Sequence, residues 1–133
     1  MSSQSSIVNE LVANKEVVGF CGSGGLDSKT VALSLKSAGV NVICFTADLG
    51  QPDEDDIEDV RTKMAPTGVE TVIVDLKNDM AEGCFDAIMC QAQYDGGYWQ
   101  STGIGRYVTC LGLLREMKKH NVTVISHGAT GRG

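Results

Sequence analysis

The 133-residue chain has the length of one domain; 42% of its residues are hydrophobic and 21% are charged, a composition that excludes a disordered chain. The sequence contains no run of 18 apolar residues, and its first residues lack the basic and apolar regions of a signal peptide. We therefore expect a cytoplasmic protein that does not associate with a membrane.

The net charge of −6 arises in one segment. Six of the 17 acidic residues lie between positions 53 and 59, and the rest of the chain carries 11 acidic and 11 basic residues. Without a clustered basic face, nucleic acid is not an expected partner. The acidic segment is expected to be a solvated helix face, and no metal-binding side chains are predicted.

The five cysteines are odd in number and include no C-x-x-C spacing. This pattern suggests neither a disulfide framework nor a zinc site. Because all five fall on apolar segments, we expect them to be small buried hydrophobic residues.

The hydrophobic pattern predicts strands that alternate with helices. The expected strands are 16–21, 40–45, 71–75 and 122–126, and the expected helices are a short one around residues 7–12, then 27–38, a helix from about Pro52 to Met64, 78–93 and 104–120. Residues 94–103 are polar and rich in glycine, and we expect them to be irregular. In the last helix, Tyr107, Val108, Leu111, Leu114 and Met117 are expected to face inward.

Alternating strands and helices predict an α/β fold with a doubly wound, Rossmann-like parallel sheet and helices on both faces. The expected order of its four strands is 3-2-1-4. Ligands bind such sheets beyond the carboxyl ends of the strands, where the winding reverses. The loops that follow the first, second and fourth strands should therefore meet at one site.

The loop after the first strand, Gly22 to Ser28, is rich in glycine and precedes a helix. Without Cβ atoms, Gly22, Gly24 and Gly25 let backbone N–H groups approach an oxyanion, and the helix N-terminus adds unpaired donors. Phosphate or pyrophosphate is the expected occupant. The loop is not a Walker A motif, because no Gly-Lys-Ser/Thr occurs, and its glycine spacing does not fit the dinucleotide fingerprint.

The segment SGGLDS (23–28) is similar to the pyrophosphate loop of the N-type ATP pyrophosphatases. Three further segments are FTADLGQ (45–51), Gly97-Tyr98 with Thr102 and Arg106, and HGATGRG (127–133). In this order the four segments resemble the argininosuccinate synthase family over about residues 15–133. The resemblance implies the adenine nucleotide alpha hydrolase-like form of the fold, with residues 1–14 as a helical lead and residues 15–133 as the nucleotide-binding domain.

The resemblance also implies a reaction. The family ligates citrulline and aspartate at the expense of ATP, through a citrullyl-adenylate, and releases argininosuccinate, AMP and pyrophosphate. This reaction belongs to arginine biosynthesis and the urea cycle. Mg²⁺ bound through the ATP phosphates is the implied cofactor, and a homotetramer is the implied assembly of the full-length family.

The residues that match the family's motifs carry implied roles. The implied ATP-binding residues are Cys21, Gly22, Ser23, Gly24, Gly25, Leu26, Asp27, Ser28, Lys29, Ala47, Gly128 and Thr130. Tyr98 and Thr102 would contact citrulline, and Thr130 would also reach aspartate. Asp27 is either an indirect Mg²⁺ ligand or a cap of its own helix. No catalytic side chain is assigned, because both steps depend on positioning and electrostatic stabilisation.

Other residues of these motifs have more ordinary interpretations. We expect Trp99 to pack rather than stack on a ligand, and His127 to orient backbone rather than act as a base. Arg106 could serve a phosphate or carboxylate, or form a surface ion pair.

The chain departs from the family's pattern at three points. Gly22 stands where an aromatic residue is common, and Lys29 replaces a small hydroxyl residue. In the family the last motif continues into an Asn-Asp pair and a synthetase domain, which this sequence does not contain. We therefore expect the chain to bind nucleotide without completing the reaction by itself.

Two alternatives remain. Another N-type ATP pyrophosphatase, such as a tRNA-thiolating or amidotransferase synthetase, would need a basic surface or cysteines placed for sulfur transfer. A non-catalytic nucleotide-binding module would need only the glycine loop.

Overall fold

The computed structural model describes residues 3–51 and 56–129. The larger elements are α1 (Ser3–Ala13), β1 (Val17–Cys21), α2 (Leu26–Ser37), β2 (Asn41–Asp48), α3 (Asp59–Met64), β3 (Glu70–Asp75), α4 (Lys77–Met89), α5 (Ser101–Lys119) and β6 (Val124–His127). A short 3₁₀ helix, η1 (Ala65–Thr67), follows α3, and two short strands, β4 (Gln93–Tyr94) and β5 (Tyr98–Trp99), lie between α4 and α5.

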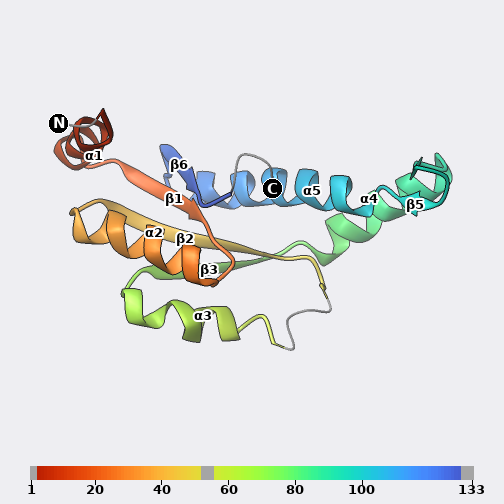
Figure 1. The fold of residues 1–133 in the computed structure, drawn as a ribbon, viewed down its shortest axis with the longest axis horizontal. Helices are drawn as coiled ribbons and strands as arrows, with labels where there is room; N and C mark the ends of the chain where they lie inside the picture. Colours follow the sequence, from red (N-terminus) through yellow and green to blue (C-terminus); the bar gives the residue numbers. More distant parts are fainter. Residues whose placement is uncertain (1–2, 52–55, 130–133) are drawn as a thin grey trace.

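The main sheet has four strands in the order β3-β2-β1-β6, and its pairings are parallel. Val18 of β1 lies opposite Val42 of β2 on one side and opposite Val124 of β6 on the other. Since β6 is the fourth strand of this sheet along the chain, the predicted order and the Rossmann-like fold class are confirmed (Figure 1).

Helices cover both faces of the sheet (Figure 1). Side chains alternate between the faces along each strand. Val42 and Cys44 of β2 therefore join a core beneath α2 and α3, together with Phe20 of β1. Ile43 and Phe45 point the other way, toward Leu113 of α5. Burial on both faces explains why the strands are continuous apolar runs.

The second predicted helix begins later than expected. Helix α3 starts at Asp59, whereas Asp56–Glu58 form a turn in which Asp56 Oδ1 accepts the Glu58 N–H at 2.9 Å. A carboxylate that bonds backbone two residues ahead competes with helix formation. Pro52, where the helix was predicted to start, lies outside the described residues. The predicted end is confirmed, because Gly68 adopts φ 63° after η1.

The glycine-rich stretch predicted to be irregular forms a hairpin. Gln93 pairs with Trp99 and Tyr94 with Tyr98 in an antiparallel ladder. Asp95 (φ 47°) and Gly96 (φ 79°) make the reversal between the two strands. Aspartate and glycine tolerate such left-handed angles, so this composition favours a tight hairpin turn. Helix α5 then begins at Ser101, three residues earlier than predicted.

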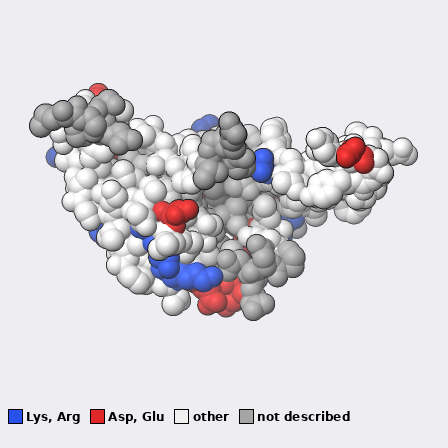
Figure 2. All heavy atoms as spheres, in the orientation of Figure 1, with Lys and Arg blue, Asp and Glu red and all other residues white. Residues whose placement is uncertain are grey.

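The hairpin lies at the end of an arm, defined as residues 77–110, that projects beyond the sheet (Figure 1). Val108 and Met117 of α5 are buried as predicted, but Tyr107 is 66% exposed, Leu111 is 45% exposed and Leu114 is 38% exposed. The prediction was wrong for these three residues because the buried face of α5 runs through Gly105, Val108, Gly112, Leu113 and Met117 instead, and the hydrophobic pattern passed over its glycines. On the face drawn in Figure 2, the arm is mostly uncharged.

The cysteines also differ from the prediction. Cys44 is buried and Cys21 and Cys84 are partly buried, but Cys90 and Cys110 are exposed. Cys90 follows α4 and Cys110 lies on α5, so the arm again presents apolar positions to solvent. All five are free thiols.

Candidate functional site

A tight loop leads from β1 into α2. Gly22 is its first residue, and its N–H donates to the Phe45 carbonyl at 3.1 Å while its own carbonyl accepts from Thr46 Oγ1 at 2.7 Å. A Cβ atom at Gly22 would lie 2.8 Å from Cys44 Sγ. The loop therefore starts pressed against β2, and only glycine fits there without a shift.

The next two glycines shape the entry to the helix. Gly24 has φ +78°, and a Cβ there would lie 3.2 Å from Val60 Cγ1. Gly25 is the N-cap of α2 and no side chain caps it; Asp27 lies in the first turn instead. Capping by Asp27, one of its two predicted roles, is thus not observed. An uncapped helix N-terminus has backbone N–H groups available for an anion.

Two serine hydroxyls brace this loop. Ser28 Oγ accepts the Ser23 N–H at 3.1 Å, and the two Oγ atoms are 3.4 Å apart. Ser28 is buried, whereas Ser23 is exposed. The contact closes the loop on itself and leaves hydroxyl donors beside the helix N-terminus.

The loop opens into a cavity of about 600 Å³ at the carboxyl edge of the sheet. Residues from β1, β2, β6, α2, α3 and α5 line it. The predicted site residues among them are Cys21, Gly22, Ser23, Gly25, Leu26, Asp27, Ser28, Ala47 and Gly128. The loops after the first, second and fourth strands of the main sheet therefore meet, as the strand order predicted.

Three predicted nucleotide-binding residues are not among these. Gly24 lies within the same loop, packed toward Val60, and Lys29 is a half-buried residue of α2. Thr130, predicted to contact both ATP and aspartate, lies outside the described residues.

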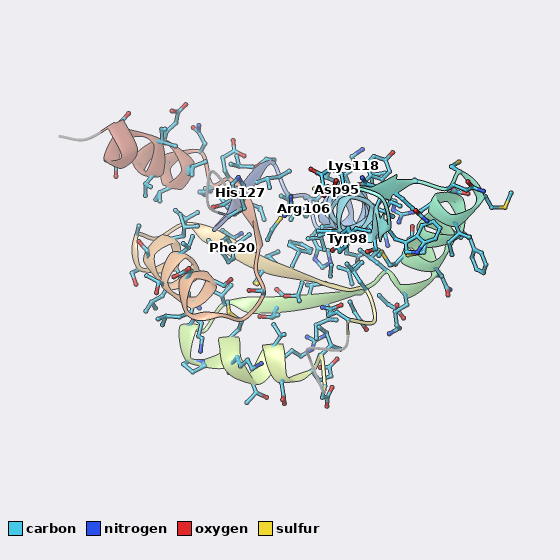
Figure 3. The ribbon with its side chains drawn as sticks, turned by 45° about the vertical axis from the view of Figure 1, so that its right-hand side comes forward. Phe20, Asp95, Tyr98, Arg106, Lys118 and His127 are labelled. Atoms are coloured by element: carbon cyan, nitrogen blue, oxygen red, sulfur yellow. The ribbon has the colours of Figure 1, made fainter. Side chains whose placement is uncertain are left out.

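The two residues predicted to contact citrulline are separated from the cavity. Tyr98 is 61% exposed in β5, and its hydroxyl lies 3.1 Å from Thr102 Oγ1 at the start of α5. Both belong to the arm, remote from the glycine loop (Figures 1 and 3). The structure brings these two side chains together with each other but does not bring them to the lining of the cavity.

The other motif residues take varied positions. The Ala129 N–H donates to His127 Nδ1 at 3.2 Å, so His127 orients backbone as predicted while also lining the cavity. Arg106 is exposed on α5. Trp99 is 40% exposed in the hairpin, so it is not a core residue, and the expectation that it packs rather than stacks on a ligand stays a prediction.

Several lining residues were not predicted. They are Phe45, Thr46, Leu49, Gln51, Ile57, Val60, Thr109, Leu113, His127 and Ala129. Leu49 and Gln51 follow the second strand within the segment FTADLGQ (45–51), so their membership of this motif could have identified them as site residues. Thr109 and Leu113 reach the cavity from α5, and no local pattern identifies them.

A charged pair holds the segment after β2. Asp48 Oδ2 accepts from Lys77 Nζ at 2.6 Å, and Asp48 Oδ1 accepts the Gly50 N–H at 3.0 Å. These hydrogen bonds, with Lys77 first, hold the pKa of Asp48 below its usual value. The Asp48 carbonyl also accepts the Leu76 N–H at 2.8 Å. The turn from Asp48 to Gln51 is therefore fastened to the start of α4.

The cavity's thiol is not a nucleophile at neutral pH. Burial, with a smaller contribution from Cys110, raises the pKa of Cys21. A thiol whose pKa is raised stays protonated, and the thiolate is the reactive form. The lining therefore offers hydrogen-bond donors and shape rather than covalent chemistry.

Two other kinds of site are absent from residues 3–51 and 56–129. In these ranges, no group of three or more His, Cys, Asp or Glu side chains is placed to hold a metal ion. No helix within them combines the length and apolarity needed to cross a membrane.

A glycine-rich loop and an uncapped helix N-terminus at the switch point of a doubly wound parallel sheet define a nucleotide-binding α/β domain. Residues 16–133 match the family described as "Arginosuccinate synthase N-terminal HUP domain". The chain therefore belongs to the argininosuccinate synthase family.

Curated relatives agree with this assignment. The argininosuccinate synthase of Psychrobacter sp. (strain PRwf-1) is 38% identical over 131 residues, which cover 96% of this chain and 31% of that protein. The enzyme of the same name from Aedes aegypti is 36% identical over 124 residues, covering 92% and 30%. The chain thus spans about a third of the length of these relatives.

Solved structures with the same fold are more distant. An NH3-dependent NAD synthetase from Campylobacter jejuni superposes with a TM-score of 0.58 at 22% identity, covering 90% of this chain and 51% of that one. A predicted subunit of tRNA methyltransferase from Methanocaldococcus jannaschii gives 0.54 at 22% identity, covering 86% and 53%. At this identity the likeness concerns the fold alone.

Proposed function

We propose that this chain is the ATP-binding domain of an argininosuccinate synthase, formed by residues 15–133 with residues 1–14 as a helical lead. The observation that carries the proposal is the loop from Gly22 to Ser28, which enters an uncapped helix at the edge of a cavity of about 600 Å³. Family membership supports it, because the matched family is defined by its N-terminal HUP domain.

In this proposal the phosphates of ATP lie over the N-terminus of α2. The backbone N–H groups of Gly24 and Gly25 would bind the pyrophosphate leaving group, together with the hydroxyls of Ser23 and Ser28. Cys21, Leu26 and Lys29 complete the surroundings of the loop. Ala47 would contact adenine through its backbone, and Gly128 and Thr130 would flank the nucleotide.

One side chain of the cavity, Asp27, is suited to a Mg²⁺ ion bound through the phosphates. Asp27 lines the cavity in the first turn of α2 and supplies a hard oxygen ligand. With no larger acidic group among the described residues, the ion would depend on the phosphates and water for its other ligands. When bound, it would neutralise charge on the departing pyrophosphate.

The proposed reaction has two steps. The ureido oxygen of citrulline attacks the α-phosphorus of ATP and displaces pyrophosphate, and the amine of aspartate then displaces AMP. Both steps need the reacting groups aligned rather than a side-chain nucleophile, which agrees with the protonated state of Cys21. Tyr98 and Thr102 are the proposed citrulline contacts, and Thr130 the proposed aspartate contact.

The 133-residue chain is not proposed to complete this reaction by itself. It spans about a third of its relatives, and Tyr98 and Thr102 lie on the arm, away from the cavity. Losing the alignment of both amino acids removes on the order of 7–11 kcal/mol of a rate enhancement. Pyrophosphate release from ATP with citrulline and aspartate should therefore stay far below an ordinary turnover of about 1 per second.

We further propose a cytoplasmic homo-oligomer, with a homotetramer for full-length members. The exposed apolar side chains of the arm, among them Phe85, Met89 and Tyr107, support an assembly that covers them. Light scattering over a concentration series measures self-association directly.

Calorimetric titration with ATP and Mg²⁺ tests the nucleotide site. Gly24→Ala should weaken binding at least tenfold, because the new Cβ presses on Val60 and moves the loop. Gly96→Ala is the matched control, since Gly96 has nearly the same φ, +79°, with open space around it. Both variants carry similar backbone strain, but only the first should lose affinity. Equal ATP affinity in the two variants would remove the loop from the binding site.

A further inference from the structure

Strand β2 continues past the end of its neighbour β1. The last pair between them is Cys21 with Phe45, whereas β2 runs on to Asp48. Backbone groups of a strand point alternately to its two edges. The Phe45 carbonyl accepts from Gly22 on the β1 side, and the Asp48 carbonyl accepts from Leu76 on the opposite side. Ala47 and Leu49, in step with Phe45, therefore direct their backbone groups to the edge that β1 leaves uncovered.

The side chain of Gln51 covers that edge. Its Oε1 accepts the Leu49 N–H at 2.8 Å, and its Nε2 donates to the Ala47 carbonyl across a longer 3.5 Å. One planar carboxamide thus bridges a backbone acceptor and a backbone donor two residues apart. All three residues line the same cavity as the glycine loop.

Adenine carries the same arrangement of polar groups. Its N6 amino group is a donor beside the N1 acceptor, as the amide NH₂ of glutamine lies beside its carbonyl oxygen. Guanine presents the reverse, an O6 acceptor beside an N1–H donor. The Ala47 carbonyl and the Leu49 N–H are therefore complementary to adenine and not to guanine.

We infer that the Gln51 carboxamide stands in for the edge of adenine, holding the Ala47 carbonyl and the Leu49 N–H until the base of the nucleotide displaces it. The inference rests on the proposed ATP binding and adds a residue that sets base affinity and selectivity. Gln51 keeps the two backbone groups hydrogen-bonded and correctly spaced in the free chain, and adenine must compete with it.

The turn does not depend on Gln51 for its shape. Asp48 already accepts the N–H groups of Gly50 and Leu76 and the ammonium of Lys77. These contacts remain when the Gln51 side chain is removed. Removal should therefore free the two recognition groups without releasing the segment that carries them.

Calorimetry on the 133-residue chain with Mg²⁺ and either ATP or GTP separates competition from structural support. Gln51→Ala should lower the Kd for ATP by about three- to tenfold, the equivalent of one or two net hydrogen bonds no longer competing. The Kd for GTP should change less than twofold. Gln93→Ala, at an exposed glutamine of the hairpin, should change neither. An unchanged or higher Kd for ATP in Gln51→Ala, or an equal change for GTP, would overturn the inference.

A second variant and a spectroscopic probe guard against a misfolded alanine variant. Gln51→Glu keeps an acceptor for the Leu49 N–H and gains charge, so it should compete more strongly and weaken ATP binding below wild type. In ¹⁵N NMR spectra of wild type, the Gln51 side-chain amide should shift on addition of ATP but not of tripolyphosphate, which has no base. An amide signal that ATP leaves in place would contradict the inference.

The two proposals fail in different ways. If wild type binds no ATP in the calorimeter, the proposed function falls and this inference falls with it. If wild type binds ATP and the substitutions at Gln51 behave like Gln93→Ala, only the inference falls.

Discussion

Lys77 Nζ donates to Asp48 Oδ2 over 2.6 Å and so joins the first residue of α4 to the last residue of β2. The pair lies directly behind the turn that carries Gln51 into the cavity. Lys77 Nζ also lies 3.4 Å from Asp75 Oδ2, so one ammonium serves the carboxyl ends of two neighbouring strands. The turn proposed to contact adenine is thereby held by α4, an element that does not itself line the cavity.

The contribution of this pair to stability should depend on pH. The Lys77 ammonium and the Gly50 N–H lower the pKa of Asp48 in the folded chain below the ordinary value of 3.8. The stability that Asp48 contributes is therefore fully present above pH 3.8 and is lost as the pH falls through the pKa of the folded state. Asp48 raises the pKa of Lys77 in the folded chain above the ordinary value of 10.5. The stability that Lys77 contributes is therefore fully present below pH 10.5 and is lost as the pH rises through the pKa of the folded state. Lys77→Met should therefore lower the urea midpoint at pH 7, and by progressively less as the pH falls below 3.8. Lys77→Arg, which keeps the charge, should restore most of the midpoint, and a deficit in Lys77→Met that keeps the same size below pH 3.8 would contradict the assignment.

Close packing of Leu76, the residue before α4, against α5 should make substitution of one helical glycine destabilising. A Cβ at Gly112 would lie 2.3 Å from Cδ2 of the buried Leu76, so Gly112→Ala should reduce the free energy of unfolding by about 1–3 kcal/mol. Gly103, on the same helix, is exposed and its nearest neighbour is Gln100 Oε1 at 3.4 Å. Gly103→Ala should instead add up to about 1 kcal/mol through helix propensity. Urea denaturation measures both, and the prediction fails if the two substitutions change stability in the same direction.

The thiols should react with iodoacetamide in an order set by burial. Cys90 and Cys110 are exposed and should be alkylated first at pH 8. Burial raises the pKa of Cys44 to about 11, so Cys44 should react only when the chain unfolds. Cys21 should react slowly and, since it lines the cavity, more slowly still with ATP present. Peptide mass spectrometry over time gives the order, and labelling of Cys44 in the folded chain as fast as Cys90 would refute it.

Removing a hydroxyl group in the cavity should weaken ATP binding, whereas removing one in the hairpin should not. Ser28→Ala removes the acceptor of the Ser23 N–H at the cavity and should weaken ATP binding by about three- to tenfold. Tyr98→Phe removes the hydroxyl that contacts Thr102 and should change the ATP Kd less than twofold, because neither Tyr98 nor Thr102 lines the cavity. Calorimetry under one set of conditions compares the two. A loss of ATP affinity in Tyr98→Phe would show that the nucleotide site extends to the hairpin.

The elements that the sequence predicted correctly are those with a local cause. The apolar run from Val17 to Cys21 is a buried strand because it is apolar on both faces, and Gly22, Gly24 and Gly25 form the phosphate-type loop because only glycine accepts those contacts and angles. The strand order followed from the alternation of strands and helices, since right-handed crossovers leave few arrangements. That order predicted that the Ser23 and Gly128 loops meet, and both line the cavity.

Helical spacing was a weaker guide in α5. It correctly placed residues such as Tyr107 and Leu111 on a shared stripe of α5, but a stripe does not say what covers it. The buried face of α5 follows Gly105 and Gly112 instead, and these two side chains remain exposed. For the same reason, apolar surroundings in the sequence did not bury Cys90 or Cys110.

The sequence by itself determined the fold class, the family and the loop that would bind phosphate, because each is encoded in neighbouring residues. Only the tertiary structure decided what the loop faces. Thr109 reaches the cavity from a helix on the far face of the sheet. Gln51 folds back onto Ala47 because β2 extends beyond the end of β1. Such contacts depend on where strands end relative to one another and on how helices cross them. Those relations are set by packing over the whole domain, so no local pattern of residues records them.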